Sequence, residues 1–174
     1  MHRLSKSLFV SAALALGGSA LAHADGLSAG RAAYARADYV AAARLLIPLA
    51  EQGNAAAQAL LGFMYANGRG VPQGYGVATF WYRLAADQGD TTAQYLLGLM
   101  YDKGFGVPLD EVAAHMWLNL AAAHAPPRNR DYYVRLRDAV ATKMTPAQIA
   151  EAQWRAQAWV PIRRSVAEAD PPAQ

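Results

Sequence analysis

Apolar residues recur at spacings of three and four along most of the chain, and this period of about 3.6 indicates amphipathic helices rather than strands. Ala57, Leu61, Met64 and Tyr65 lie on or beside one helical face, and the same arrangement returns 36 residues later. Gly62 stands beside this stripe, where the missing side chain would let a second helix approach closely. The pattern predicts a chain of short helices that pack tightly in pairs.

The sequence repeats itself with a period of 36 residues. When residues 43–78 are placed over residues 79–114 without a gap, fifteen of the 36 positions are identical. The identities include glycine, proline and tyrosine, which two alanine-rich helices would not share by chance at one fixed offset. Trp81 and Trp117 continue the match beyond this segment. A fixed period of this size is typical of stacked repeat units, because one unit alone cannot bury its apolar face.

Each full unit is predicted to contain two helices separated by a Gly-x-Gly-Val-Pro loop. Asn54 and Asp90 are good N-caps for the first helix of each unit. Glycine accepts the positive φ common at a helix end, and proline removes the residue before it from helical conformation. Asp110 would cap the second helix of the later unit, whereas Gly74 offers no capping side chain in the earlier one.

The segments on either side of the two full units depart from the repeat. A shortened unit precedes them, and Pro48 within its second helix predicts a kink or an early end near residues 45–49. After residue 124, Thr145 and the residues that follow it open a last helix with a capping box. The predicted organisation is a signal peptide at 1–24, a solenoid at 25–124 with a shortened unit at about 28–53 and full units at about 54–89 and 90–124, capping helices at 125–164 and a disordered tail at 165–174.

The first 24 residues have the layout of a secretory signal peptide. Arg3 and Lys6 give a basic start, an apolar stretch follows, and Ala22-His23-Ala24 supplies a small-x-small cleavage pattern. Cleavage is expected after Ala24 or, as the alternative, after Ala22. A retained membrane anchor is the competing interpretation, but the apolar core is short for a membrane span. We therefore expect a periplasmic or secreted protein that does not span a membrane once the signal is removed.

Cleavage of the signal changes the charge of the chain. The full chain has 16 basic and 13 acidic residues, and the loss of Arg3 and Lys6 (16 − 2 = 14) lowers the net charge from +3 to +1. So small a charge gives little attraction to nucleic acid.

The absence of cysteine excludes disulfides, thiolate nucleophiles and cysteine-bound metals. Four arginines lie close together late in the chain, namely Arg128, Arg130, Arg135 and Arg137. They are expected to form a solvated helix face. Alternatively, they could bind anionic lipid or an acidic partner.

No motif in the sequence predicts catalysis, a cofactor or a metal. Ser28 and Ser165 are the only serines after the signal, and neither belongs to a Gly-x-Ser-x-Gly or Ser-x-x-Lys motif. His115 and His124 are nine residues apart, without the spacing of a helical metal pair. Carboxylates at predicted helix starts are explained by capping. A carboxylate site on two facing helices stays open as the basis of an alternative function.

The repeated residues resemble a known family. The pattern Ala-Gln-x-x-Leu-Gly-x-x-Tyr-x-x-Gly-x-Gly-Val, followed by Ala-x-x-Trp-x-x-x-Ala-Ala, begins at Ala57 and again at Ala93. It resembles the Sel-one-like repeat (Sel-like repeat) family of exported bacterial type, a relative of the tetratricopeptide repeat, over about residues 28–124. The resemblance implies an all-α, right-handed α/α superhelical solenoid that serves as an adaptor or scaffold. A cysteine-rich branch of the family is linked to penicillin, and this chain has none of its cysteines.

First helices line the inner face of such solenoids, and positions that differ between the units are free to face a ligand. Phe63, Leu99 and also Tyr95 could alternatively pack against the neighbouring unit. The function predicted is an exported adaptor or scaffold that binds a protein or peptide in the bacterial envelope, and the alternative is a cell-wall-associated enzyme or ligand-binding protein. The residues predicted to line the groove are Arg31, Tyr34, Phe63, Tyr95, Leu99 and Asp102.

Overall fold

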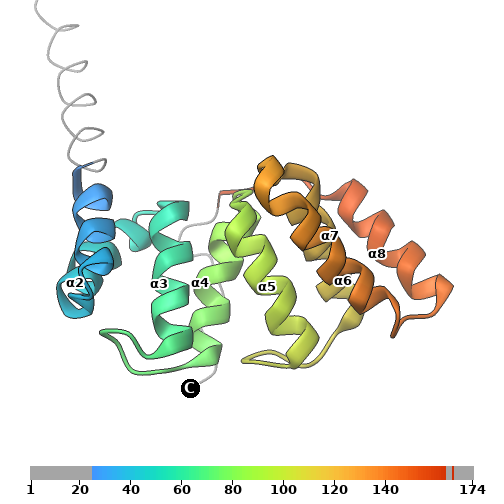
Figure 1. Cartoon of the computed structure of the whole chain (residues 1–174), viewed down its shortest axis with the longest axis horizontal. Coiled ribbons are helices and arrows are strands. Elements are labelled where there is room, and N and C mark those ends of the chain that lie inside the picture. The colour runs from blue at the N-terminus through green and yellow to red at the C-terminus, as the bar shows by residue number, and fades with distance from the viewer. Residues whose placement is uncertain (1–24, 164–165, 167–174) are drawn as a thin grey trace, which may run out of the picture.

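The computed structural model describes residues 25–163 and residue 166, and every regular element in that part of the chain is helical (Figure 1). This confirms the predicted fold class, a solenoid of stacked helix pairs. The signal peptide predicted at residues 1–24 lies outside the described residues. The helices are residues 25–35, α2 (Tyr39–Glu51), α3 (Ala55–Asn67), α4 (Tyr75–Asp87), α5 (Thr91–Lys103), α6 (Glu111–His124), α7 (Pro127–Ala141) and α8 (Pro146–Ala158).

The helices begin at the residues predicted to cap them. The side chains of Asn54, Asp90 and Asp110 accept hydrogen bonds from the backbone N–H three residues further on, at 3.0, 2.8 and 2.9 Å. Each bond satisfies one of the N–H groups that a helix start leaves unpaired. Gly74 precedes α4 without a side-chain cap, so this helix begins with one stabilising bond fewer than its counterpart α6.

The early end predicted for the helix that contains Pro48 does not occur, because α2 continues through the proline to Glu51. The pyrrolidine ring removes one backbone hydrogen bond, and it lies on the exposed side of the helix. Leu49 and Ala50 directly after it are buried at 7% and 0% exposure. Burial of these two apolar side chains favours the helical continuation over an early end.

The recurring glycines Gly62 and Gly98 lie where the two helices of a unit cross. A Cβ atom on Gly98 would lie 2.8 Å from Cγ of Leu118 on α6, and one on Gly62 would lie 2.8 Å from the ring of Tyr82 on α4. Real Cβ atoms do not approach other heavy atoms so closely, because packing at native density leaves no such overlap. Glycine at this position therefore sets how closely the two helices of each unit approach.

The two glycines of each loop serve different purposes. Gly104 ends α5 in the left-handed conformation, with φ of 67°. Gly106 also has a positive φ, of 71°, but a Cβ atom there would collide with the backbone carbonyl of Tyr75 at the start of α4. The loop that ends α5 thus rests on the helix pair before it, and the glycines 36 residues earlier repeat both features.

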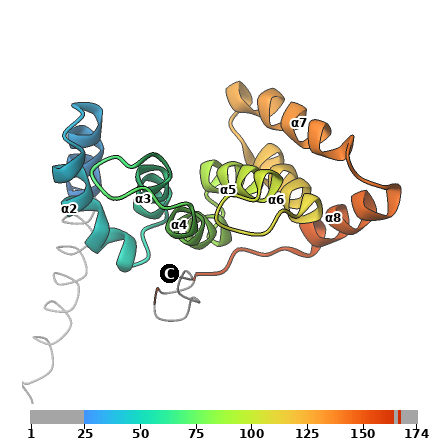
Figure 2. The same ribbon diagram turned by 90° about the horizontal axis from the view of Figure 1, so that it is seen from below.

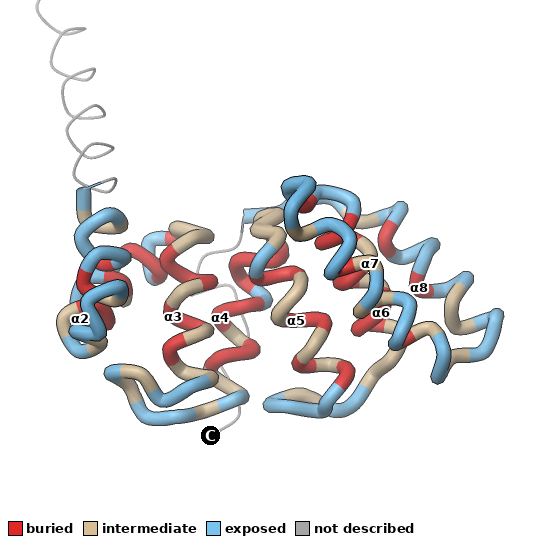
Figure 3. Tube along the Cα trace, in the orientation of Figure 1, coloured by how far each residue is buried: buried red, intermediate tan, exposed pale blue. Residues whose placement is uncertain are grey.

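The two largest hydrophobic core clusters each join neighbouring units. One cluster combines buried residues of α2, such as Leu46, with Leu61 of α3 and Trp81 of α4. The next cluster combines Ala59 of α3 with residues of α4 and α5 and with Trp117 of α6. The buried parts of the chain accordingly face the contacts between helices, while the loops are exposed (Figure 3). Stability is shared across the junctions, as expected for a solenoid.

Buried glutamines also join the units. Gln58 and Gln94 have no exposed surface. The Nε2 group of Gln58 donates to the carbonyl of Ala50 at 2.9 Å, and that of Gln94 donates to the carbonyl of Ala86 at 3.3 Å. Both carbonyls lie in the last turn of the preceding unit's second helix, where they also accept from the backbone N–H of Gly53 and of Gly89, respectively. The glutamine of the repeat pattern therefore carries a hydrogen bond from each unit to the one before it.

The last two helices close the array differently from a repeat unit. α7 and α8 both pack against α6, and in Figure 2 they diverge on either side of it. The predicted capping box is confirmed at Thr145, which exchanges hydrogen bonds with Gln148. The side chains that these two helices bury are Tyr133 and Val140 from α7 and Ala152 and Ala156 from α8.

Candidate functional site

A pocket of about 320 Å³ opens between the first helices of successive pairs. The described chain forms a shallow arc in Figure 2, and residues 25–35, α3 and α5 contribute the walls of this pocket. A volume of this size lies at the lower end of ordinary ligand pockets. The residues that line it are Arg31, Tyr34, Ala56, Ala59, Leu60, Phe63, Asp90, Thr92 and Leu96.

One difference between the two full units helps to leave the pocket open. Ala59 of α3 corresponds to Tyr95 of α5, 36 residues later. Ala59 leaves space between α3 and α5. Tyr95 fills the corresponding space between α5 and α7, where its ring stacks on Tyr133 at 4.7 Å between centroids and lies near Tyr132 at 5.8 Å. The small side chain of Ala59 thus lines a cavity, whereas the large side chain at the equivalent position of the next unit packs against α7.

The walls of the pocket combine an apolar floor with one cationic and one anionic group. Leu60, Phe63 and Leu96 supply the apolar surface. Arg31 is exposed at one side, and Asp90 lies half-buried where it caps α5. Burial raises the pKa of the Asp90 carboxyl, and backbone N–H groups and Arg31 act in the opposite direction. Both signs of charge are therefore available to orient a ligand whose apolar part enters the cavity.

The rim of the pocket is braced by an arginine held among aromatic rings. The guanidinium carbon of Arg69 lies 5.7, 5.4 and 5.5 Å from the ring centroids of Tyr34, Tyr39 and Phe63. Arg69 also donates a hydrogen bond to the hydroxyl of Tyr34. Cation–π contacts of this kind are attractive at such distances. They fix two pocket residues, one from each of two neighbouring units, relative to each other.

The structure brings three of the six predicted groove residues together at the pocket, namely Arg31, Tyr34 and Phe63. Tyr95 instead packs against α7. Burial raises the pKa of its hydroxyl, and the hydrogen bond between the Tyr95 and Tyr132 hydroxyls acts in the same direction. Leu99 is half-buried and does not line the pocket.

Sequence reasoning missed that Leu96 and Asp90 face the pocket. The prediction used the difference between units as its only guide, and Leu60 and Leu96 are identical in the two units. The helical period of α5 nevertheless distinguishes Leu96 from Tyr95. Thr92 and Leu96 are four residues apart and so share a helical face, whereas Tyr95 lies about 100° away from Leu96 around the helix.

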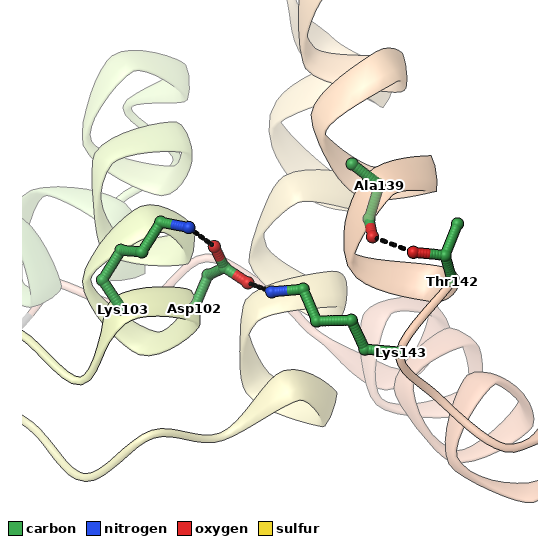
Figure 4. Close-up of polar contacts among 5 residues, drawn as sticks. All are labelled: Asp102, Lys103, Ala139, Thr142 and Lys143. Atoms are coloured by element: carbon green, nitrogen blue, oxygen red, sulfur yellow. Dashed lines mark hydrogen bonds and ion pairs between the residues drawn. The ribbon is translucent and has the colours of Figure 1, made fainter.

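Asp102 joins α5 to the C-terminal helices instead of lining the pocket. Its carboxylate is 7% exposed and binds Lys103 at 2.9 Å and also Lys143, which follows α7 (Figure 4). Burial alone would raise the pKa of Asp102, but the two ammonium groups hold it below its ordinary value. The carboxylate is thus committed to an ion pair within the protein.

The histidine at position 115 lies inside the protein, at 3% exposure. Burial lowers its pKa, and Arg137 acts in the same direction while Asp138 opposes it.

The described residues contain no group of three or more histidines or carboxylates that could hold a metal ion. Within the same part of the chain, none of the helices has the length and apolar character needed to cross a membrane.

Stacked helix pairs with a pocket on the side of the first helices define an α/α solenoid of the tetratricopeptide-like class. Residues 10–54, 55–90 and 91–125 each match the model of the Sel1 repeat. These matches cover more than half of the 174 residues, and the chain belongs to the Sel1 repeat family. Sel1 repeat proteins are generally protein-interaction scaffolds of a non-catalytic type. No curated protein matches the chain.

The solved structures that are similar to this one include the following two. The first is c5321, a protective antigen present in uropathogenic Escherichia coli strains that displays an SLR fold, with a TM-score of 0.73 and 27% identity over 79% of this chain and 29% of that one. The second is a Sel1 repeat protein from Oxalobacter formigenes, with a TM-score of 0.51 and 37% identity over 56% of this chain and 28% of that one. The chain spans less than a third of the length of either protein.

Proposed function

We propose that this protein is an exported adaptor that binds a segment of a partner protein in the pocket between α3 and α5. The observation that carries the proposal is the pocket itself, which three successive first helices form from an apolar floor with Arg31 and Asp90 at its sides. Repeat solenoids commonly bind their partners along the surface that their first helices line. The scaffold character of the family supports the same conclusion.

The pocket suggests the chemistry of the partner segment. Its floor suits one large aliphatic or aromatic side chain, since buried anchors of this kind carry most of the energy at protein interfaces. Arg31 would attract an acidic group on one side of that anchor, and Asp90 a basic or hydrogen-bond-donating group on the other. The partner segment is therefore an apolar anchor flanked by polar residues.

Filling the pocket is expected to weaken partner capture at least about tenfold, because the anchor loses the cavity it would enter. Ala59→Tyr copies the residue found 36 positions later, and Ala56→Trp reaches the same space from a half-buried position. The measurement is the amount of each envelope protein retained by the immobilised mature chain from an envelope extract. Circular dichroism of each variant first establishes that it folds.

Ala123→Tyr is the matched control, because Ala123 is exposed on α6, outside the pocket. It should retain the partner at the level of the unmodified protein. Unchanged capture by a folded Ala59→Tyr and a folded Ala56→Trp would remove the pocket from the binding site. Retention of purified peptidoglycan in place of any protein would favour the ligand-binding alternative.

The export part of the proposal rests on the basic, apolar and small-x-small succession in the first 24 residues. We expect the protein recovered from the cell envelope to begin at Asp25, or at His23 if the earlier cleavage pattern is used. Intact-mass measurement distinguishes these two masses from that of the uncleaved chain. A mature mass that still includes residues 1–20 would contradict export through a cleaved signal.

A further inference from the structure

The chain turns back after α8 and runs as an extended segment along the solenoid. Residues 159–163, here called the strap, follow the side of α6 and α4 away from α7 in Figure 2. Trp159 packs against the core cluster of the two full units, with its ring edge-to-face on Trp117 at 6.3 Å between centroids. The backbone N–H of Ile162 donates to the carbonyl of Asp87 at 2.7 Å.

The strap contacts the same turn in two successive units. Gly53 and Gly89 occupy equivalent positions where one unit passes into the next, with φ of 87° and 90°. A Cβ atom on Gly89 would lie 3.8 Å from the ring of Trp159, and one on Gly53 would lie 3.7 Å from Nε of Arg163. Four residues of extended chain span about 13 Å. The strap therefore crosses one complete unit between its first and last contacts.

The chain beyond the strap reaches the other end of the solenoid. Val166 is half-buried and packs against the N-terminal core cluster, which includes residues of α2 such as Leu46. The same cluster includes residues of α3 and α4, and Arg163 lies beside Gly53 in the turn after α2. The C-terminal segment therefore reaches the junction between the first helix pair and the first full unit. This packing was not predicted, because the residues from 165 onwards were expected to form a disordered tail.

We propose that the strap ties the C-terminal cap to the first helix pair, so that the stability of residues 25–51 depends on Trp159 and Ile162. A solenoid held together only by neighbouring contacts would behave differently. In such an array the loss of a contact in the cap destabilises the adjacent unit, and this destabilisation decreases with distance from the cap. With the strap in place, the loss of its anchor also releases the helix pair at the far end.

Hydrogen exchange on the full chain tests this proposal. Trp159→Ala is expected to raise the exchange rates of backbone amides in residues 25–51 by on the order of tenfold, because these helices lose a packed partner and open more often. Trp154→Ala is the matched control, since Trp154 lies on α8 at 63% exposure. It should leave the exchange of residues 25–51 unchanged.

A second pair of variants isolates the backbone hydrogen bond. Ile162→Pro removes the N–H that donates to Asp87, whereas Ile162→Ala shortens the same side chain and keeps that N–H. Faster exchange of residues 25–51 in Ile162→Pro than in Ile162→Ala supports the proposal even if Trp159→Ala fails to fold. Changes confined to α6 and α8 in all these variants would overturn it.

Discussion

Gly98→Leu is expected to lower the free energy of unfolding by about 3 kcal/mol, or by roughly 10 °C in Tm for a chain of this size. The first added carbon would already lie 2.8 Å from Cγ of Leu118 and 3.2 Å from the carbonyl oxygen of Ala114. The larger side chain must push α5 and α6 apart, and both helices also carry contacts to the C-terminal cap. Thermal unfolding followed by circular dichroism measures the loss.

Two further substitutions determine whether the helix crossing causes the effect of Gly98→Leu. Gly98→Ala adds only the first carbon, against a side chain that can shift, and should lie between the unmodified protein and the leucine variant. Ala123→Leu places the same leucine at an exposed position of α6 and should leave Tm within about 2 °C of the unmodified protein. A Tm for Gly98→Leu equal to that of Ala123→Leu would show that the crossing tolerates a side chain.

The two glycines of one loop are expected to differ in their sensitivity to alanine. Gly104 and Gly106 have similar positive φ values, 67° and 71°, so alanine at either position incurs a backbone strain of about 1–2 kcal/mol. Gly104→Ala adds nothing more, because its Cβ would find its nearest neighbour at 3.5 Å. Gly106→Ala adds a collision with the backbone of Tyr75, which cannot rotate away as a side chain could.

The difference in free energy of unfolding between Gly104→Ala and Gly106→Ala therefore measures how much the contact between the loop and the preceding unit contributes to stability. Gly106→Ala should lose about 2 kcal/mol more than Gly104→Ala, because a backbone shift at Tyr75 separates the loop from the preceding helix pair. Urea unfolding of the two variants under identical conditions gives both free energies. Equal losses would mean that positive φ alone explains the glycine at position 106.

Helix positions and caps could be predicted from the sequence because they depend on local chemistry. Asn54, Asp90 and Asp110 cap the helices they were expected to cap. Of the kink or early end predicted at Pro48, the early end is wrong, because burial of Leu49 and Ala50 is a tertiary effect that local propensity does not contain.

The candidate site was predicted only in part, for a reason that lies in the geometry of stacking. Arg31, Tyr34 and Phe63 line the pocket, as predicted for a groove formed by the first helices. Tyr95 was expected beside them, yet its side chain faces the next unit, where it fills the space that Ala59 leaves open in the unit before. Variation between repeats marks positions near the groove, but it does not tell on which side of its helix a residue lies.

The length of the strap also limits how many units this protein can contain. Trp159 and Arg163 contact equivalent turns one unit apart, and the chain between them is already extended. If another 36-residue unit were inserted before α7, the cap would move outward by one unit and the same segment would end one turn short of the first helix pair. Growth of the array by duplication, which is simple for an open solenoid, would here require a matching extension of the C-terminal segment.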